Sequence, residues 1–126
     1  MNYKVVVVDD DELILFLHSR IIQVSGLHKT PKTFNSAQKA LDYFVEIGDD
    51  GEPILLFLDI NMPVMDGWGL LDLIHQDDFK KQIKVVMVTS SVDQEDKDKA
   101  ATYSKIIDFI EKPLNKANLA HSSVRF

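Results

Sequence analysis

The chain has 126 residues, of which 45% are hydrophobic and 27% charged, and this length fits one globular domain with little room for a second. It has no cysteine, which excludes disulfides and thiolate metal sites, and its formal net charge of −6 argues against nucleic acid, whose binding relies on lysine and arginine. Its hydrophobic runs, such as Val5–Val8 and Ile54–Leu58, are far shorter than the roughly 20 residues that span a membrane, and no signal peptide precedes them, so we expect a cytoplasmic protein.

Short apolar runs rich in β-branched residues alternate with stretches whose apolar residues lie three and four apart, which predicts alternating strands and helices. The expected strands are Lys4–Val8, a weaker one at His28–Phe34, Ile54–Leu58, Ile83–Val88 and Ile106–Ile110. Three of these are almost wholly apolar, as expected of parallel strands that are covered on both faces. The pattern predicts an α/β fold: a five-stranded, doubly wound parallel sheet with helices on both faces.

Helices are expected where apolar residues recur at helical spacing. The first is marked by Leu13, Phe16, Leu17, Ile21 and Val24. The second, which Asn35 or Ser36 would cap, is marked by Ala37, Ala40, Leu41, Phe44 and Val45, and the third by Leu70, Leu71 and Ile74. The fourth, roughly Gln94–Tyr103, is rich in charge and should pack thinly, and the last is expected at Asn115–Phe126 with Asn115 as its cap.

Polar side chains gather where the predicted strands end, which is where open parallel sheets bind ligands. The first strand ends in Asp9-Asp10-Asp11-Glu12, the third in Asp59, the fourth in Thr89 and the fifth in Glu111-Lys112-Pro113. If the first and third strands are neighbours, Asp9, Asp10 and Asp59 converge, and two charges ~4 Å apart repel by roughly 4 kcal/mol at an effective dielectric constant of ~20. Such a cluster needs a cation or a raised pKa, and oxygen ligands suit Mg²⁺ where a phosphate also binds. For Asp11 and Glu12 we expect only a favourable interaction with the N-terminus of the first helix.

Four segments resemble those of response-regulator receiver domains, in the order and approximate spacing of that family. They are Val5–Asp10 (VVVVDD), Leu58–Gly67 (LDINMPVMDG), Thr89-Ser90 and Lys112-Pro113. The resemblance spans essentially the whole chain, residues 1–126, and implies a flavodoxin-like strand order of 2-1-3-4-5. Each segment alone is a weak signal, whereas the four together are specific.

The resemblance implies that Asp59 is a phosphoryl acceptor, which is nucleophilic catalysis by a carboxylate. Mg²⁺ would be held by Asp10 directly, by Asp9 through water, by Asp59 and by the backbone carbonyl of Asn61. Lys112 would reach the phosphoryl oxygens as a point charge, and the Thr89 hydroxyl would donate a hydrogen bond to one of them. The Lys112-Pro113 peptide is expected to be cis, because proline makes that isomer accessible.

The family's switch pairs the hydroxyl of Thr89 with an aromatic side chain three residues before the lysine, which is Phe109 here. Thr89 turning toward the phosphoryl group would open space for Phe109 and change the surface formed by the fourth helix, fifth strand and fifth helix. Asn61 and Ser91 stand where the family tunes the lifetime of the phosphoryl group, and neither is a base that could activate water. Asp66 is expected to serve the turn that starts the third helix and to have no catalytic role.

The expected function is that of a receiver without an output domain, phosphorylated by a sensor histidine kinase or a histidine phosphotransfer protein. It would signal by binding another protein, and it would catalyse only its own phosphorylation and dephosphorylation. One alternative is a receiver-like interaction module that works without phosphorylation. Another is a phosphohydrolase of the haloacid-dehalogenase type, which would want a second aspartate where this chain has Asn61. The four histidines, among them His18 and His75, have no ligand spacing, and we expect structural or surface roles for them.

Overall fold

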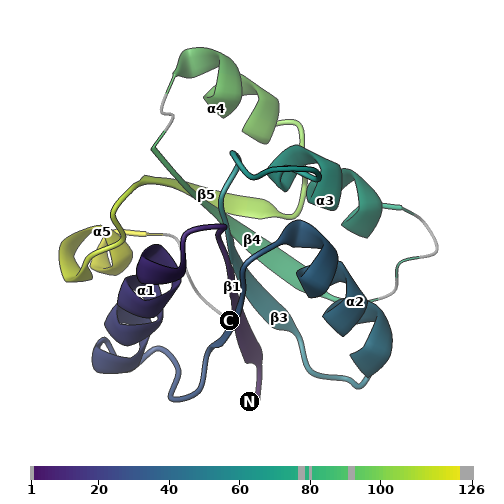
Figure 1. The fold of residues 1–126 in the computed structure, drawn as a ribbon, viewed down its shortest axis with the longest axis horizontal. Helices are drawn as coiled ribbons and strands as arrows, with labels where there is room; N and C mark the ends of the chain where they lie inside the picture. The colour runs from purple at the N-terminus through teal and green to yellow at the C-terminus, as the bar shows by residue number, and fades with distance from the viewer. Residues whose placement is uncertain (1, 77–78, 80, 91–92, 123–126) are drawn as a thin grey trace.

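The computed structural model describes residues 2–76, 79, 81–90 and 93–122 and shows a parallel sheet flanked by helices (Figure 1). The strands are β1 (Lys4–Val8), β2 (Lys32–Phe34), β3 (Ile54–Leu58), β4 (Ile83–Thr89) and β5 (Ile106–Glu111). The helices are α1 (Glu12–Val24), α2 (Ala37–Ile47), α3 (Gly67–Ile74), α4 (Gln94–Ala100) and α5 (Lys116–Ala120). The strand order is β2-β1-β3-β4-β5, so the predicted fold class and order 2-1-3-4-5 are confirmed.

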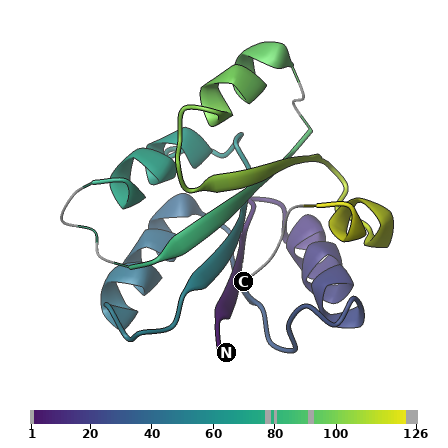
Figure 2. The same ribbon diagram turned by 180° about the vertical axis from the view of Figure 1, so that it is seen from behind.

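Two hydrophobic cores lie on opposite faces of the sheet because successive strand residues point to opposite sides. In β1, Val6 and Val8 join the core beneath α2 and α3, whereas Val5 and Val7 join the core beneath α1 and α5. All five residues of β3 are buried, which explains why this strand reads as one continuous apolar run. The two views from opposite sides show α1 and α5 on one face of the sheet and α2, α3 and α4 on the other (Figures 1 and 2).

The predicted second strand begins too early, since β2 is only Lys32–Phe34. His28 forms a local turn instead: the backbone N–H of Thr30 donates to its Nδ1 at 3.1 Å, and its Nε2 lies 3.0 Å from the carbonyl oxygen of Tyr3. Pro31 follows and has no N–H to give to a neighbouring strand. The ladder to β1 therefore starts only after the proline.

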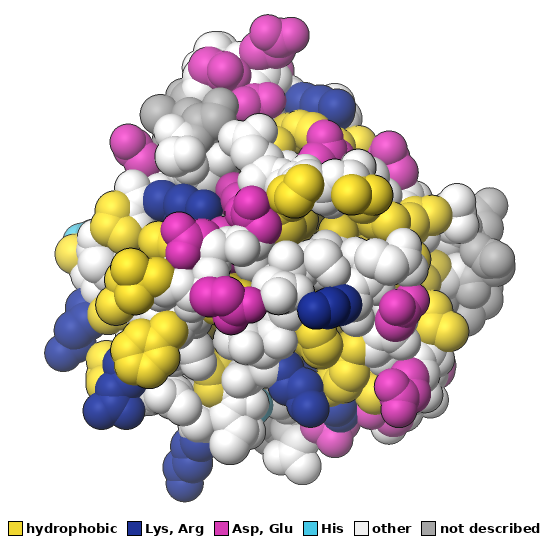
Figure 3. Space-filling model, viewed as in Figure 1, with side chains coloured by type: hydrophobic (Ala, Val, Ile, Leu, Met, Phe, Trp, Pro, Cys, Tyr) yellow, Lys and Arg dark blue, Asp and Glu magenta, His cyan; other side chains and the backbone are white. Residues whose placement is uncertain are grey.

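The first helix is present as predicted, but most of the apolar residues that mark it are not the ones that it buries. In α1 the buried residues are Leu15, His18 and Ile22. Four of the residues that mark the helix, Leu13, Phe16, Leu17 and Val24, have exposed fractions of 64%, 67%, 43% and 50%. The helix carries apolar residues on two faces, so their spacing alone does not say which face meets the sheet. Hydrophobic side chains accordingly gather on the molecular surface over α1 (Figure 3).

The fourth helix is shorter than the predicted Gln94–Tyr103, because Tyr103 leaves it to pack on α3. The ring of Tyr103 stacks on Trp68 with 5.6 Å between centroids, and its hydroxyl donates to Asp72 at 2.7 Å. Lys99 adds a cation–π contact, with its Nζ 4.6 Å from the Trp68 centroid. Ala100 is the buried residue of α4, which agrees with the expectation that this helix packs thinly.

The remaining helices begin where the sequence predicts. Ser36 caps α2, and of the residues that mark this helix, Ala37, Ala40 and Phe44 are buried whereas Val45 is exposed. Asn115 caps α5 in a reciprocal capping box with Asn118, and α5 ends at Ala120, while residues 123–126 of the predicted helix lie outside the described residues. No helix in the described part of the chain has the length and hydropathy needed to cross a membrane.

Gly67 makes the closest approach between α3 and the loop after β3. Its N–H donates to the carbonyl oxygen of Ile60 at 2.8 Å. A Cβ at this position would overlap the carbonyl oxygen of Asp59 and lie 3.0 Å from the Cα of Ile60. Both neighbours are backbone, so the contact cannot be relieved by a change of rotamer.

We expect Gly67→Ala to lower the free energy of unfolding by about 1–3 kcal/mol, the usual cost of overpacking. Gly69→Ala is the matched control in the same helix, because its Cβ would lie 3.0 Å from the flexible side chain of Met65 and alanine favours helix by up to about 1 kcal/mol. Urea denaturation of both variants measures the difference. Equal stability of the two variants would contradict the assigned close contact.

Candidate functional site

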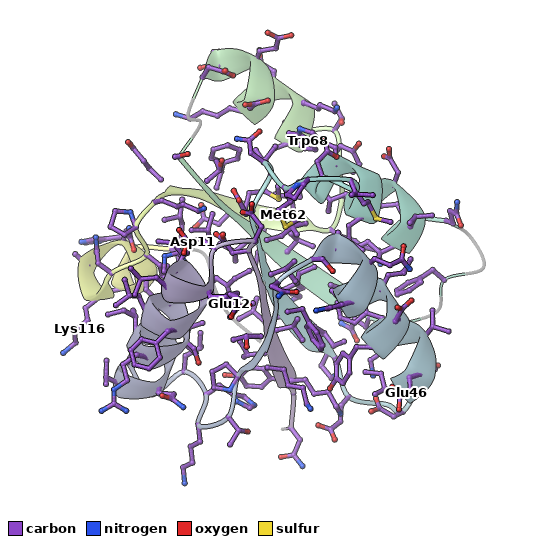
Figure 4. The ribbon with its side chains drawn as sticks, in the orientation of Figure 1. Asp11, Glu12, Glu46, Met62, Trp68 and Lys116 are labelled. Carbon is purple, nitrogen blue, oxygen red and sulfur yellow. The ribbon has the colours of Figure 1, made fainter. Side chains whose placement is uncertain are left out.

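The predicted site residues do come together at the carboxyl edge of the sheet. Asp9, Asp59 and Lys112 directly follow β1, β3 and β5, and Thr89 ends β4. Backbone hydrogen bonds join these strand ends: the N–H of Asp59 donates to Val8 at 3.1 Å, and the N–H of Lys112 donates to Thr89 at 2.9 Å. In Figure 4, Asp11 and Met62, from the loops after β1 and β3, lie at this same edge.

Three carboxylates form the acidic centre of the site. Asp9, Asp10 and Asp59 each present an oxygen within 4.8 Å of the other two. Asp9 and Asp59 are 2% and 4% exposed, whereas Asp10 is exposed. We predicted that these three carboxylates converge if the first and third strands are neighbours. Strands β1 and β3 pair along their whole length, so the prediction is confirmed.

Lys112 balances part of this charge. Its Nζ lies 2.6 Å from Oδ2 of Asp9 and 3.3 Å from Oδ2 of Asp59, so one ammonium group bridges both buried carboxylates. Burial alone would lower the pKa of Lys112, but the hydrogen bond to Asp9 and the charges of Asp59 and Asp9 outweigh burial and raise it. Lys112 is therefore a fixed positive charge at neutral pH.

The charge on Asp59 is only partly compensated. Burial and the neighbouring charge of Asp9 raise the pKa of Asp59, against the opposing effect of Lys112 and a backbone hydrogen bond from Asn61. Because the net shift is upward, the ionised form of Asp59 is less favourable in the folded protein than in water. A cation placed among the three carboxylates would relieve this, and a donor set made of oxygen atoms fits Mg²⁺.

The other acidic residues of the first loop have the structural roles predicted for them. Asp11 caps α1 by accepting from the N–H of Leu13 at 2.9 Å, and its own N–H donates to Oδ1 of Asp9 at 3.0 Å. Glu12, in the first turn, accepts from the amide of Asn35 at 2.8 Å. The cap of α1 thus also orients the Asp9 carboxylate.

The loop after Asp59 likewise matches its prediction. Asp66 caps α3 by accepting from the N–H of Gly69 at 2.9 Å, in agreement with a structural role. Asn61 is exposed beside Asp59, where its side chain supplies no carboxylate of the kind that a phosphohydrolase of the haloacid-dehalogenase type would want. The Lys112-Pro113 peptide is cis, as predicted.

Thr89 and Phe109 lie on the same face of the sheet. Thr89 is fully buried, and its backbone pairs with Glu111, while Phe109 pairs with Met87 two residues back along β4. Phe109 is half-buried and packs against the core beneath α2 and α3. The exchange between the two side chains stays a prediction, and Ser91, two residues beyond Thr89, lies outside the described residues.

His18, for which a structural or surface role was expected, has a structural one. It is 2% exposed, and its Nε2 accepts a hydrogen bond of 3.1 Å from the N–H of Leu114, a specific contact two residues after Lys112 that was not predicted. The signal that could have indicated the burial of His18 is its place in α1, three residues after Leu15 and four before Ile22, which makes it the polar member of a buried stripe.

Residues 5–123 match the family model of the response regulator receiver domain. Among characterised proteins, the chain is 34% identical to the two-component response regulator ARR22 of Arabidopsis thaliana over 92% of this chain and 78% of that protein. It is also 29% identical to the hybrid signal transduction histidine kinase L of Dictyostelium discoideum, where the match covers 92% of this chain but only 7% of the longer protein.

Solved structures agree with this assignment. A two-component response regulator from Cytophaga hutchinsonii superposes with a TM-score of 0.82 at 30% identity, covering 94% of this chain and 91% of that one. A response regulator receiver protein from Dyadobacter fermentans gives a TM-score of 0.81 at 29% identity, covering 95% and 94%. With the acidic edge, the lysine and the strand order all in place, the chain belongs to the response-regulator receiver domains of two-component signalling.

Proposed function

We propose that Asp59 is the residue on which this receiver domain accepts its phosphoryl group. The observation that carries the proposal is the position of the Asp59 carboxylate, buried at the end of β3 beside two further carboxylates and the Lys112 ammonium. Burial and the charge of Asp9 raise the pKa of Asp59, so negative charge is already disfavoured at this position. A phosphoryl group would add further negative charge, which Lys112 and a bound cation would have to neutralise. Membership of the receiver family supports the same assignment.

The reaction needs little beyond positioning and charge neutralisation. An oxygen of the Asp59 carboxylate attacks phosphorus and forms the new P–O bond, while the bond from phosphorus to the imidazole nitrogen of a phosphohistidine breaks. The nitrogen keeps the electron pair and takes up a proton. The Lys112 ammonium, which contacts the Asp59 carboxylate before the reaction, then also binds a phosphoryl oxygen. The hydroxyl of Thr89 donates a hydrogen bond to another phosphoryl oxygen.

We propose Mg²⁺ as the cofactor, held by Asp9, Asp10, Asp59 and the backbone carbonyl of Asn61. When bound, the ion supplies positive charge to the oxygens of the transferring group and of the carboxylates. The cluster of three carboxylate oxygens within 4.8 Å supports this choice, since neither histidine nor cysteine contributes to it. Lys112 alone compensates only part of the negative charge, as the raised pKa of Asp59 indicates.

The phosphoryl donor in this proposal is a sensor histidine kinase or a histidine phosphotransfer protein. One of the similar proteins is itself a hybrid histidine kinase. The exposed apolar side of α1 would receive it, because Leu13, Phe16 and Leu17 follow directly on the acidic loop of the site. A groove of about 460 Å³ beside Phe16, lined also by Arg20 and Thr33, adds to this surface.

The signal would leave through contacts with another protein at the face formed by α4, β5 and α5. Phe109, Asp108 and Glu111 line an open groove of about 490 Å³ between β5 and α5, so a movement of Phe109 would alter its shape. The exchange of Thr89 and Phe109 is the switch that we propose. A cytoplasmic location stays a prediction from the sequence.

We expect incubation with acetyl phosphate and Mg²⁺ to add one phosphoryl group to the wild-type protein and none to Asp59→Asn, as measured by intact mass. Removing Mg²⁺ with EDTA should abolish the adduct. Asp66→Asn, which changes an exposed carboxylate on the same loop, is the matched control and should still be phosphorylated. An adduct on Asp59→Asn would contradict the assignment of the acceptor, and its complete absence from the wild type would favour a module that works without phosphorylation.

We expect Asp59→Asn to stabilise the metal-free protein at pH 7 by on the order of 1 kcal/mol, a usual single-site effect. The reason is that the raised pKa of Asp59 makes its ionised form unfavourable, and asparagine resembles the protonated side chain. The stability difference between Asp59→Asn and the wild type should disappear on acidification. As the pH falls from the raised pKa of Asp59 to the pKa of an ordinary aspartate, the wild-type side chain becomes protonated and loses its unfavourable charge. Mg²⁺ should stabilise the wild type more than the variant. Thermal melts between pH 4 and 8 test the signs, and a variant less stable at every pH would refute them.

We expect Phe16→Ser to slow phosphoryl transfer from a donor protein by about tenfold while leaving labelling by acetyl phosphate unchanged. Val45→Ser is the control, because Val45 is 69% exposed, similar to Phe16 at 67%, but lies on α2. The donor is found by screening phosphorylated histidine kinases and phosphotransfer proteins of the same genome. Equal rates for the two variants would exclude α1 as the docking surface.

A further inference from the structure

His18 is the buried polar residue of α1 that the proposed reaction does not use. It lies on the face that packs toward β5 and α5, between the apolar side chains of Leu15 and Ile22, and is 2% exposed. Its Nε2 accepts the N–H of Leu114, 96 residues further along the chain. Leu114 is itself 3% exposed and belongs to the core beneath α1 and α5.

This hydrogen bond determines the chemical state of the imidazole ring. An accepting Nε2 carries no hydrogen, so the ring is neutral with its proton on Nδ1. Burial lowers the pKa of His18, and of the two charges that act on the ring, Asp9 raises the pKa while Lys112 lowers it further. The ring is therefore a hydrogen-bond acceptor inside the protein at neutral pH.

The same hydrogen bond fixes the backbone on the far side of Lys112. On the near side, the N–H of Lys112 donates to Thr89 at 2.9 Å. Pro113 has no N–H, so Leu114 offers the next backbone donor after Lys112, and His18 is its partner. From the exposed side, the amide of Asn118 donates to the carbonyl oxygen of Pro113 at 3.0 Å. The turn that carries Lys112 is thus anchored at β4, at α5 and, in the core, at α1.

We propose that His18 is a positioning residue for Lys112: its acceptor nitrogen holds the turn after β5 so that the ammonium group lies between Asp9 and Asp59. This inference rests on the proposed function, in which Lys112 contacts the transferring phosphoryl group. Reaction rates are sensitive to displacements of about 1 Å in such groups. His18 acts only through the backbone and touches no reacting atom.

Two substitutions of His18 distinguish the effect of losing the hydrogen-bond acceptor from the effect of changing the size of the side chain. In glutamine, Oε1 is as many bonds from the Cα as Nε2 is in histidine, so His18→Gln can keep the hydrogen bond. His18→Leu fills similar space without an acceptor. Ile22→Val is the control for a loosened helix. Ile22 is fully buried on the same face of α1, and its side chain cannot form a hydrogen bond to the turn.

The first measurement is the rate of phosphorylation by acetyl phosphate at saturating Mg²⁺, as a function of donor concentration. We expect His18→Leu to lower the maximal rate by roughly ten- to a hundredfold, while His18→Gln and Ile22→Val stay close to the wild type. A wild-type rate in His18→Leu, or an equal loss in His18→Gln or Ile22→Val, overturns the inference. A wild type that forms no adduct refutes the proposed function instead, and the second measurement then judges His18.

The second measurement uses NMR and does not depend on phosphorylation. Ring nitrogen shifts should show His18 of the folded wild type neutral and protonated on Nδ1. Titration of the Lys112 ammonium should show its pKa falling in His18→Leu and returning in His18→Gln, since a displaced ammonium group loses its contacts with Asp9 and Asp59. A ring protonated on Nε2, or a Lys112 pKa that is the same in all variants, overturns the inference.

Discussion

The mutual repulsion of Asp9 and Asp59 is the constraint around which this structure is organised. Two carboxylates that are almost completely buried, at 2% and 4% exposure, would be strongly unfavourable without a partner, and Lys112 is the positive charge that bridges them. The lysine reaches them because β5 and β4 place it at the same edge. Burial and the charge of Asp9 still raise the pKa of Asp59 despite Lys112, so a cation bound among these carboxylates would stabilise their ionised forms.

The site is assembled by the parallel topology and by short local contacts. Each strand ends at the same edge, so residues that are far apart in sequence become neighbours without any dedicated loop. Local contacts then aim the side chains: the N–H of Asp11 orients Asp9, and Gly67 lets α3 approach the backbone of Asp59. Because both the fold and the site depend on these contacts, substitutions at the edge are expected to change stability and chemistry together.

Most of the site could be predicted from the sequence because its residues are adjacent to strands that are recognisable from composition. β1 and β3 lie within their predicted bounds, and the acidic residues follow them directly. The outward face of α1 could not be predicted, since apolar residues occupy both sides of that helix and Phe16, at 67% exposure, is as hydrophobic as the buried Leu15. The spacing of His18 in α1 could have indicated its burial, but its hydrogen-bond partner could not be predicted, because that partner is a backbone N–H 96 residues away.

The position of α4 also depends on contacts that the helix itself does not supply. Its sequence is mostly charged, and Ala100 is its buried residue, so little apolar area holds it to the sheet. Tyr103, just after the helix, instead stacks on Trp68, and Trp68 follows Gly67, the residue pressed against the backbone of Asp59. A continuous series of packed groups therefore runs from the acidic edge through the start of α3 to the end of α4. Because α4 itself buries so little, the contacts of Tyr103 and Lys99 with Trp68 are what connect the end of this helix to the start of α3.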